Sequence, residues 1–139
     1  MNFWDTSAVV PLLLDEKQTS AVKTVYQRDP VQMVWCLTDV EISAALSRRV
    51  REGLSEGRSQ KIRDDWKTLA QMWRSVASLD LVRARAIRLV QTHPLRAADA
   101  LQLASALVAS GERPETLPFV CLDDRLRDAA RREGFPILP

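Results

Sequence analysis

The sequence predicts an α/β fold of three layers, in which a central parallel sheet of about four or five short strands is flanked by about seven helices. Short apolar runs alternate along the chain with longer segments in which apolar residues recur at helical spacing. This alternation is typical of a parallel sheet covered by helices on both faces. The 139 residues suit one domain, and no repeat, low-complexity tract or long linker divides them. We therefore expect residues 1–139 to form a single domain.

The first elements are a short strand and a helix. An apolar pair predicts a strand over residues 2–4, and Thr6-Ser7 then offer an N-cap. Pro11 is tolerated only near the start of a helix, which places that start at Thr6 or Ser7. The elements expected next are a helix over 19–28 that ends before Asp29-Pro30, a strand over 33–36, and a helix capped by Thr38 that runs to Glu52 or Gly53.

The second half of the chain continues the alternation. A helix is expected to begin at Ser59, and its stripe of Ile62, Trp66, Leu69 and Trp73 recurs at helical spacing and is expected in the core. The remaining elements expected are a strand over 76–79, a helix capped by Asp80 and stopped by His93-Pro94, a helix over 96–110, a strand over 119–122, a helix over 123–133 and a short strand over 136–138.

The two cysteines and the N-terminal residues indicate the cellular compartment of the protein. Cys36 and Cys121 each end a predicted buried strand, and neither has the Cys or His spacing of a zinc site. We interpret them as reduced thiols of a cytoplasmic protein. A charge at Asp5 is unlike the start of a signal peptide. No apolar stretch approaches the ~20 residues needed to cross a bilayer, so we expect no membrane contact.

Four acidic residues lie where the chain passes from strand to helix or in the first turn of a helix. They are Asp5, Glu41, Asp99 and Asp123. In open α/β sheets, ligands bind outside the carboxyl ends of the strands. Carboxylates gathered at that edge repel one another unless a cation lies among them, and oxygen-only ligand sets suit Mg²⁺ or Mn²⁺. The pattern indicates metal-dependent phosphodiester chemistry.

Each of the four carboxylates also has a structural alternative. Asp5 and Asp123 each precede a predicted helix and could be plain N-caps, and Asp124 competes with Asp123 for that role. Asp99 lies in an almost wholly apolar helix, where a buried carboxylate is costly unless it is paired or metal-bound. Arg96, three residues earlier, is one possible partner.

Glu41 has the most specific alternative. Thr38-x-x-Glu41 matches a capping box, in which the glutamate reaches back to the backbone N–H of Thr38. A glutamate folded back in this way does not point fully at a metal, so the two roles conflict.

Four motifs in register resemble one family. They are Asp5-Thr6-Ser7-Ala8, the helix start Thr38-x-x-Glu41, Leu95-x-Ala-x-Asp99-Ala100-Leu101-x-Leu103-Ala104, and Phe119-Val120-Cys121-Leu122-Asp123-x-Arg125-Leu126. Together they resemble the PIN domain, and more closely the VapC toxins of bacterial VapBC toxin–antitoxin pairs. The resemblance spans nearly the whole chain.

The resemblance implies a PIN-like parallel sheet wrapped by helices and an Mg²⁺- or Mn²⁺-dependent endoribonuclease that cleaves tRNA, rRNA or mRNA. It maps the acidic quartet onto the same four residues, both as catalytic groups and as metal ligands. Thr6 or Ser7 matches the hydroxyl position that follows the first aspartate, and Asp124 is a secondary candidate. Two departures are Cys121, where family members usually have Thr or Ser, and Trp4, where an aliphatic residue is commoner.

The resemblance also implies partners. RNA would meet the site through the densest stretch of arginines, and an antitoxin tail would cover the two helices between residues 38 and 73. A homodimer is expected as well. Net charge is only +2, but 16 of the 20 basic residues are arginine, which binds phosphate through a planar fork. The arginine cluster could instead be the solvated surface of a helix pair, and the high arginine content could reflect coding bias. The alternative function for the whole chain is a non-catalytic RNA- or protein-binding module. The arginines singled out for RNA are Arg48, Arg49, Arg51 and Arg58.

Overall fold

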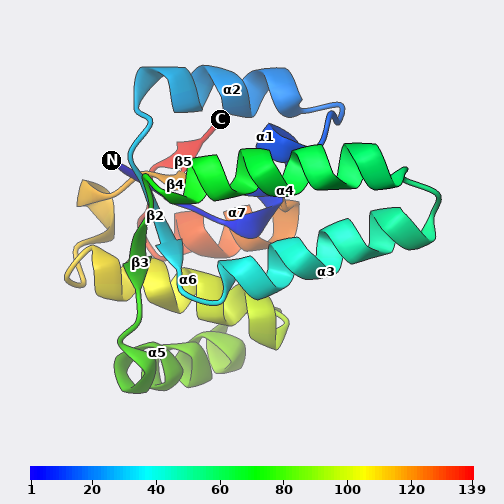
Figure 1. Cartoon of the computed structure of the whole chain (residues 1–139). Coiled ribbons are helices and arrows are strands. Elements are labelled where there is room, and N and C mark those ends of the chain that lie inside the picture. The colour runs from blue at the N-terminus through cyan, green and yellow to red at the C-terminus, as the bar shows by residue number, and fades with distance from the viewer.

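One parallel sheet of five strands forms the centre of the computed structural model, which describes residues 1–139 (Figure 1). The strand order is β3-β2-β1-β4-β5. The strands are β1 (Asn2–Trp4), β2 (Gln32–Trp35), β3 (Arg74–Val76), β4 (Phe119–Val120) and β5 (Ile137–Leu138). The helices are α1 (Thr6–Leu13), α2 (Thr19–Arg28), α3 (Thr38–Arg51), α4 (Glu56–Ala70), α5 (Leu79–Thr92), α6 (Ala97–Ala109) and α7 (Asp124–Arg132), with a 3₁₀ turn at Pro114–Thr116. The predicted α/β class and parallel sheet are confirmed.

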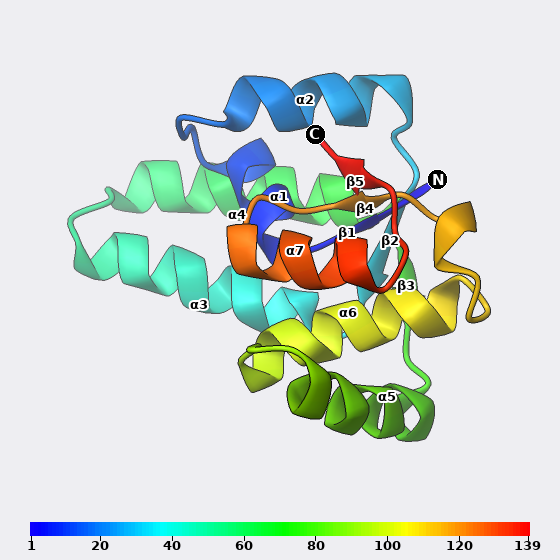
Figure 2. The same ribbon diagram turned by 180° about the vertical axis from the view of Figure 1, so that it is seen from behind.

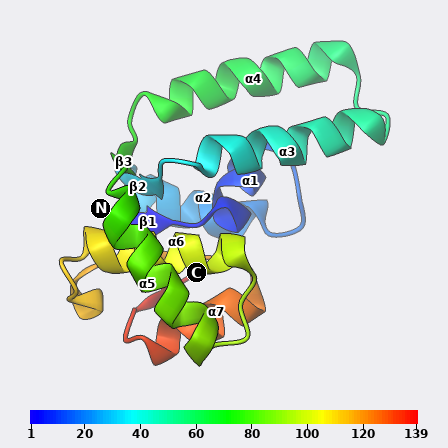
Figure 3. The ribbon, with the colours of Figure 1, turned by 90° about the horizontal axis from the view of Figure 1, so that it is seen from below.

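Helices cover both faces of the sheet, because side chains alternate between the faces along each strand. One face packs on α5, α6 and α7, and the other packs on α1, α2 and α3 (Figures 2 and 3). Phe3, Trp35 and Phe119 belong to the first core, and Trp4, Val34 and Val120 belong to the second.

The helices α3 and α4 form an antiparallel pair that extends beyond the sheet (Figure 3). The predicted stripe lies only partly in the core, and its last residue, Trp73, lies beyond the end of α4. Ile62 is buried, whereas Trp66, Leu69 and Trp73 are partly buried against the second core. None of the helices combines the length and apolarity that crossing a bilayer requires. Both cysteines are free thiols.

Several predicted boundaries differ from the structure. The fifth helix begins at Leu79 after Ser78 and not at a cap on Asp80, and the strand predicted over 119–122 ends at Val120. Two further differences are larger. The fourth helix begins at Glu56 instead of Ser59, because the hydroxyl of Ser55 accepts a hydrogen bond from the backbone N–H of Arg58 at 3.3 Å. The third strand covers 74–76 instead of 76–79, because it pairs in register with Met33–Trp35 of β2. Pairing between strands, which a single segment does not encode, fixes the second boundary.

A polar cluster joins the ends of α5 and α7 on the first core. The carboxylate of Glu133 accepts two hydrogen bonds from the guanidinium of Arg88, at 2.8 and 3.0 Å, and lies 2.7 Å from Nε2 of His93. The hydrogen bonds from Arg88 lower the pKa of Glu133, with His93 contributing further. His93 is therefore occupied by a structural contact, and it does not line the pocket described below.

Replacing Glu133 by glutamine is expected to lower the free energy of unfolding by about 1–3 kcal/mol at neutral pH, the usual range for a hydrogen-bonded charge. Because the pKa of Glu133 is lower in the folded state, its contribution is present above the unfolded-state pKa and disappears as the pH falls through the folded-state pKa. Urea unfolding at neutral and acid pH checks this. Glu112→Gln, which breaks an exposed ion pair with Arg85, is the control and is expected to change stability by less than ~1 kcal/mol. Equal effects of the two substitutions at neutral pH would contradict the prediction.

Candidate active site

The strand order reverses at β1. The chain moves from β1 outwards to β2 and β3, and it then returns to place β4 on the other side of β1. The carboxyl ends of β1 and β4 therefore lie at a topological switch point, where open α/β sheets bind their ligands. Asp5 directly follows β1 and Asp123 follows β4 by three residues, so both side chains are delivered to this edge.

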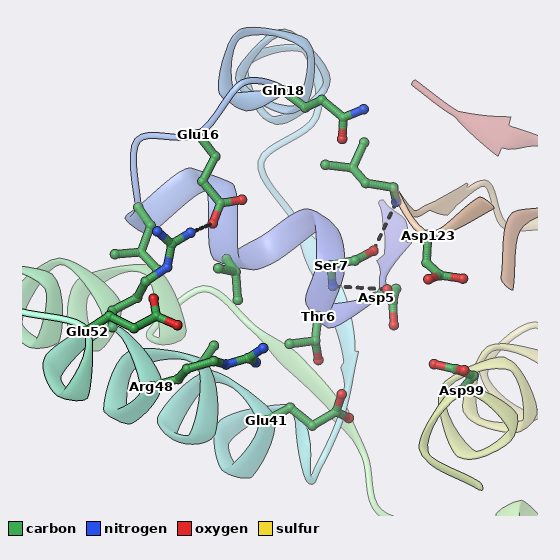
Figure 4. Close-up of a pocket in the computed structure, with 15 residues that line it drawn as sticks. Asp5, Thr6, Ser7, Glu16, Gln18, Glu41, Arg48, Glu52, Asp99 and Asp123 are labelled. Carbon is green, nitrogen blue, oxygen red and sulfur yellow. Dashed lines mark hydrogen bonds and ion pairs between the residues drawn. The ribbon is translucent and has the colours of Figure 1, made fainter. Parts of the chain in front are cut away.

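An open pocket of about 640 Å³ lies at this edge, and all four predicted carboxylates line it (Figure 4). They come from four separate segments: the start of α1, the first turn of α3, the first turn of α6 and the start of α7. Thr6 and Ser7 line the same pocket. The fold thus brings together residues that are more than 100 positions apart in the sequence.

Asp5 is the most buried of the four, with 4% of its surface exposed. It is the N-cap of α1, because its Oδ2 accepts a hydrogen bond from the backbone N–H of Ser7 at 3.0 Å. The Sγ atom of Cys121 lies 3.6 Å from the same oxygen. Burial raises the pKa of Asp5, and repulsion from Asp99 adds to this. The capping role and the pocket position therefore coexist in one side chain.

Asp123 has the same double placement. Its Oδ1 accepts a hydrogen bond from the backbone N–H of Leu126 at 2.8 Å, which makes it the N-cap of α7. Asp124 is the first residue of the helix and is exposed. It lines a neighbouring hollow and not the acidic pocket.

Glu41 does not form the predicted capping box. Leu37 is the N-cap of α3, and no side chain caps this helix end. The Oε1 atom of Glu41 instead accepts a hydrogen bond from Nε2 of Gln102 at 2.9 Å. Burial raises the pKa of Glu41, the hydrogen bond from Gln102 opposes this, and the charge of Asp5 raises it further. The prediction of a capping box is wrong because of a tertiary contact: α6 supplies a hydrogen-bond partner for Glu41 that the local sequence does not contain.

Asp99 lies in the first turn of α6 and is partly buried. Burial raises its pKa, and repulsion from Asp123 adds to this. Arg96 and Arg125 attract its charge, but no ion pair joins either arginine to a carboxylate. The predicted pairing of Asp99 with Arg96 is thus a weak, longer-range attraction.

The donor set suits a divalent cation. The pocket offers carboxylate oxygens and hydroxyls, with no histidine lining it. No three ligating side chains converge on one point, an arrangement that fits an ion held by one or two carboxylates together with water, as Mg²⁺ commonly is. The pKa values of Asp5, Glu41 and Asp99 are all raised, in part by mutual repulsion, which a cation would relieve.

The predicted RNA-facing arginines separate into two groups. Arg48 and Arg49 line the acidic pocket, and the guanidinium of Arg48 points into it in Figure 4. Arg49 is paired with Glu16. Arg51 lines a different hollow, between α3 and α4, and Arg58 lines neither that hollow nor the acidic pocket.

Sequence reasoning gave no RNA-binding or positioning role to three residues beside the pocket. Arg96 and Arg125 line the adjoining hollow of about 670 Å³, which shares Asp99 and Asp123 with the acidic pocket. Gln102 lies behind the pocket wall and contacts Glu41. A signal for Gln102 was available, because it lies one helical turn after Asp99 and is the only polar side chain among its immediate neighbours.

Comparisons with known proteins identify a family. The PIN domain family matches residues 3–132. Two proteins of Mycobacterium tuberculosis, Ribonuclease VapC45 (strain CDC 1551 / Oshkosh) and Ribonuclease VapC49 (strain ATCC 25618 / H37Rv), are each 30% identical over 138 residues, which cover 99% of this chain and 94% of theirs.

Two solved structures share the fold. FitAcB from Neisseria gonorrhoeae superposes with a TM-score of 0.69 at 14% identity, covering 100% of this chain and 97% of the other. PAE2754 from Pyrobaculum aerophilum superposes with a TM-score of 0.64 at 20% identity, covering 98% and 81%.

Proposed function

Because the chain belongs to the PIN-domain family and to its VapC-type ribonucleases, we propose that it is a metal-dependent endoribonuclease that hydrolyses RNA phosphodiester bonds in the cytoplasm. We further propose that it is the toxin of a type II toxin–antitoxin pair. The observation that carries the catalytic proposal is the gathering of four carboxylates from four segments in one open pocket at the switch point of the sheet. Because like charges repel, such a cluster does not stabilise the fold, and this favours a functional role for it.

The chain's own groups have distinct tasks in this proposal. Asp5, Glu41, Asp99 and Asp123 would surround Mg²⁺ or Mn²⁺, one or two of them as direct ligands and the others through bound water. The ion when bound would supply an activated water and a counter-charge for phosphate oxygens. One of the carboxylates can orient the attacking water or take its proton. Asp5 and Asp123 are fixed by their capping bonds, which pre-organises both side chains.

The experiment that tests the proposal measures cleavage and metal binding together. Purified chain is incubated with total RNA in Mg²⁺, in Mn²⁺ or in chelator, and new RNA 5′ ends are sequenced for the wild type and for Asp99→Asn. We expect defined ends that need both the cation and Asp99. We also expect Mn²⁺ to raise the melting temperature, since a ligand of the native state stabilises it by mass action. RNA binding without new ends would instead support a non-catalytic module.

We also propose that three arginines beside the acidic quartet contact RNA. Arg48 lines the acidic pocket, and Arg96 and Arg125 line the adjoining hollow. None of the three is tied to a carboxylate by an ion pair. Guanidinium groups in these places can bind the phosphates that flank the cleaved bond.

The double substitution Arg96→Ala/Arg125→Ala is expected to weaken RNA binding and to reduce the slope of log affinity against log salt by about 1.4, or ~0.7 for each lost contact to a single strand. Arg51→Ala/Arg58→Ala removes the same charge from outside the pocket and is the matched control, expected to leave the slope nearly unchanged. Binding is measured by fluorescence anisotropy on an Asp5→Asn background, so that RNA is not consumed. An equal fall in slope for both pairs would mean that RNA binds the basic helix pair, as the sequence first suggested.

A further inference from the structure

A buried amide ties the wall of the acidic pocket together. Gln102 is 1% exposed and lies on α6, one turn after Asp99. Its Nε2 is 2.9 Å from Oγ1 of Thr6 and 2.9 Å from Oε1 of Glu41. It is also 3.3 Å from Oγ1 of Thr38. One side chain of α6 therefore bridges α1 and α3 behind the pocket.

Charge fixes the orientation of this amide. Its two N–H hydrogens match the two acceptors at 2.9 Å, which are the hydroxyl of Thr6 and the carboxylate of Glu41. Turning the amide over would place Oε1 of Gln102 against the Glu41 carboxylate, and the two oxygens would repel. In the observed orientation Oε1 is buried without a hydrogen-bond partner.

The unpaired Oε1 atom argues against a purely structural role for Gln102. A buried polar atom without a partner costs stability, and an apolar residue of similar size at position 102 would avoid this cost. The hydrogen bond from Gln102 to Glu41 compensates for that cost. Without Gln102, Glu41 is free to turn back to the backbone N–H of Thr38 and close the capping box that the local sequence encodes.

We propose that Gln102 is a positioning residue, which holds the Glu41 carboxylate in the acidic pocket and so raises the affinity of the pocket for a divalent cation. The inference rests on the proposed function for its catalytic consequence. Its structural half, the orientation of Glu41, stands on the hydrogen bonds alone.

The test compares Gln102→Leu with the wild type, Glu41→Gln and the double variant. Gln91→Leu is the control, since Gln91 is exposed on α5 and does not line the pocket. Calorimetric titration with Mn²⁺ is expected to show ~10-fold weaker binding in Gln102→Leu, the lower end of what loss of a group behind a metal ligand costs. The kcat is expected to fall by a similar factor, with KM for RNA nearly unchanged. The stability of the metal-free protein is expected to fall, because the buried hydroxyls of Thr6 and Thr38 lose the same donor.

The double variant separates positioning from general damage. If Gln102 acts through Glu41, Gln102→Leu changes Mn²⁺ affinity little once Glu41 is glutamine, because both substitutions remove the same interaction. The proposal would be overturned if the losses of Mn²⁺ affinity in Gln102→Leu and Glu41→Gln added in full in the double variant. Unchanged Mn²⁺ affinity in Gln102→Leu alone would overturn it as well. Should Gln102→Leu fold poorly, the more flexible Gln102→Met replaces it in the same set of variants.

A crystal structure of the Gln102 variant provides a readout that does not depend on the metal. Glu41 is expected to leave the pocket for the backbone N–H of Thr38, and a Glu41 that keeps its wild-type position would overturn the inference. If the wild-type chain neither binds Mn²⁺ nor cleaves RNA, the proposed function fails, and the position of Glu41 in the variant still decides whether Gln102 holds it.

Discussion

Replacing Asp99 by asparagine is expected to reduce RNA cleavage by roughly a thousandfold, the scale of losing one group that organises transition-state charge. The same change is expected to leave the metal-free protein as stable as the wild type or more stable. Burial and the charge of Asp123 raise the pKa of Asp99, so its ionised form is disfavoured in the folded state. Removing the charge removes that penalty. Cleavage is measured on a defined RNA, and stability is measured by urea unfolding in chelator.

The neighbouring carboxylate Asp124 provides the control. It is exposed and lies outside the acidic pocket, although it lines the adjoining hollow. Asp124→Asn is therefore expected to keep its stability and to lose far less activity than Asp99→Asn. Loss of folding in Asp99→Asn would show that Asp99 is structural. Full cleavage by Asp99→Asn would show that Asp99 is not part of the active site, and it would also contradict the proposed metal site.

The same electrostatics give the metal-free protein a distinct pH response. Folded-state pKa values above the unfolded ones mean that Asp5, Glu41 and Asp99 bind protons more readily in the native chain. Stability should therefore fall as the pH rises through these raised values. Saturating Mn²⁺ should flatten that part of the curve. Glu133, whose pKa is lowered, acts in the opposite sense at more acid pH.

The sequence predicted the carboxylate positions because strand ends and helix starts are local features. An apolar run followed by Asp and a helix start describes both Asp5 and Asp123, and parallel pairing brings such ends to one edge. The structure places both there as helix caps. The capping alternative and the pocket position were thus not exclusive, and local sequence alone had no means of showing this.

What the sequence could not predict depends on contacts between distant segments. Thr38-x-x-Glu41 encodes a capping box, but a side chain 61 positions away takes the Glu41 carboxylate instead. Arg96 and Arg125 stand apart in the sequence and meet only where α6 and α7 begin at the same hollow. The basic stretch after Arg48 was conspicuous as a run, yet a helix points its residues in different directions, so Arg51 faces another groove.

Expression of the wild-type chain alone is expected to arrest bacterial growth, because an RNase active on cellular RNA is harmful unless it is restrained. Asp5→Ala should relieve the arrest. Asp5→Asn should do the same and is the sharper variant, since asparagine can keep the N-cap bond to Ser7 while it is a poorer cation ligand. Growth is followed after induction, with immunoblots to show equal amounts of protein. A wild-type chain that is harmless at equal expression and binds RNA tightly would replace this proposal with the non-catalytic one.

Co-expression of a small antitoxin is expected to restore growth, and the structure suggests how it would act. The hollow between α3 and α4 is lined by Leu46, Val50 and Trp66 and can receive an amphipathic segment. The acidic pocket is lined by the other face of α3, so the segment would have to continue past α3 to place an arginine there. Such an arginine would neutralise carboxylates proposed to hold the cation. Antitoxin and Mn²⁺ should then compete, so each weakens the binding of the other by the same factor. Calorimetric titration of a peptide from the antitoxin tail with and without Mn²⁺ measures that factor. Peptide affinity that is independent of Mn²⁺ would mean that the antitoxin restrains the enzyme without entering the pocket.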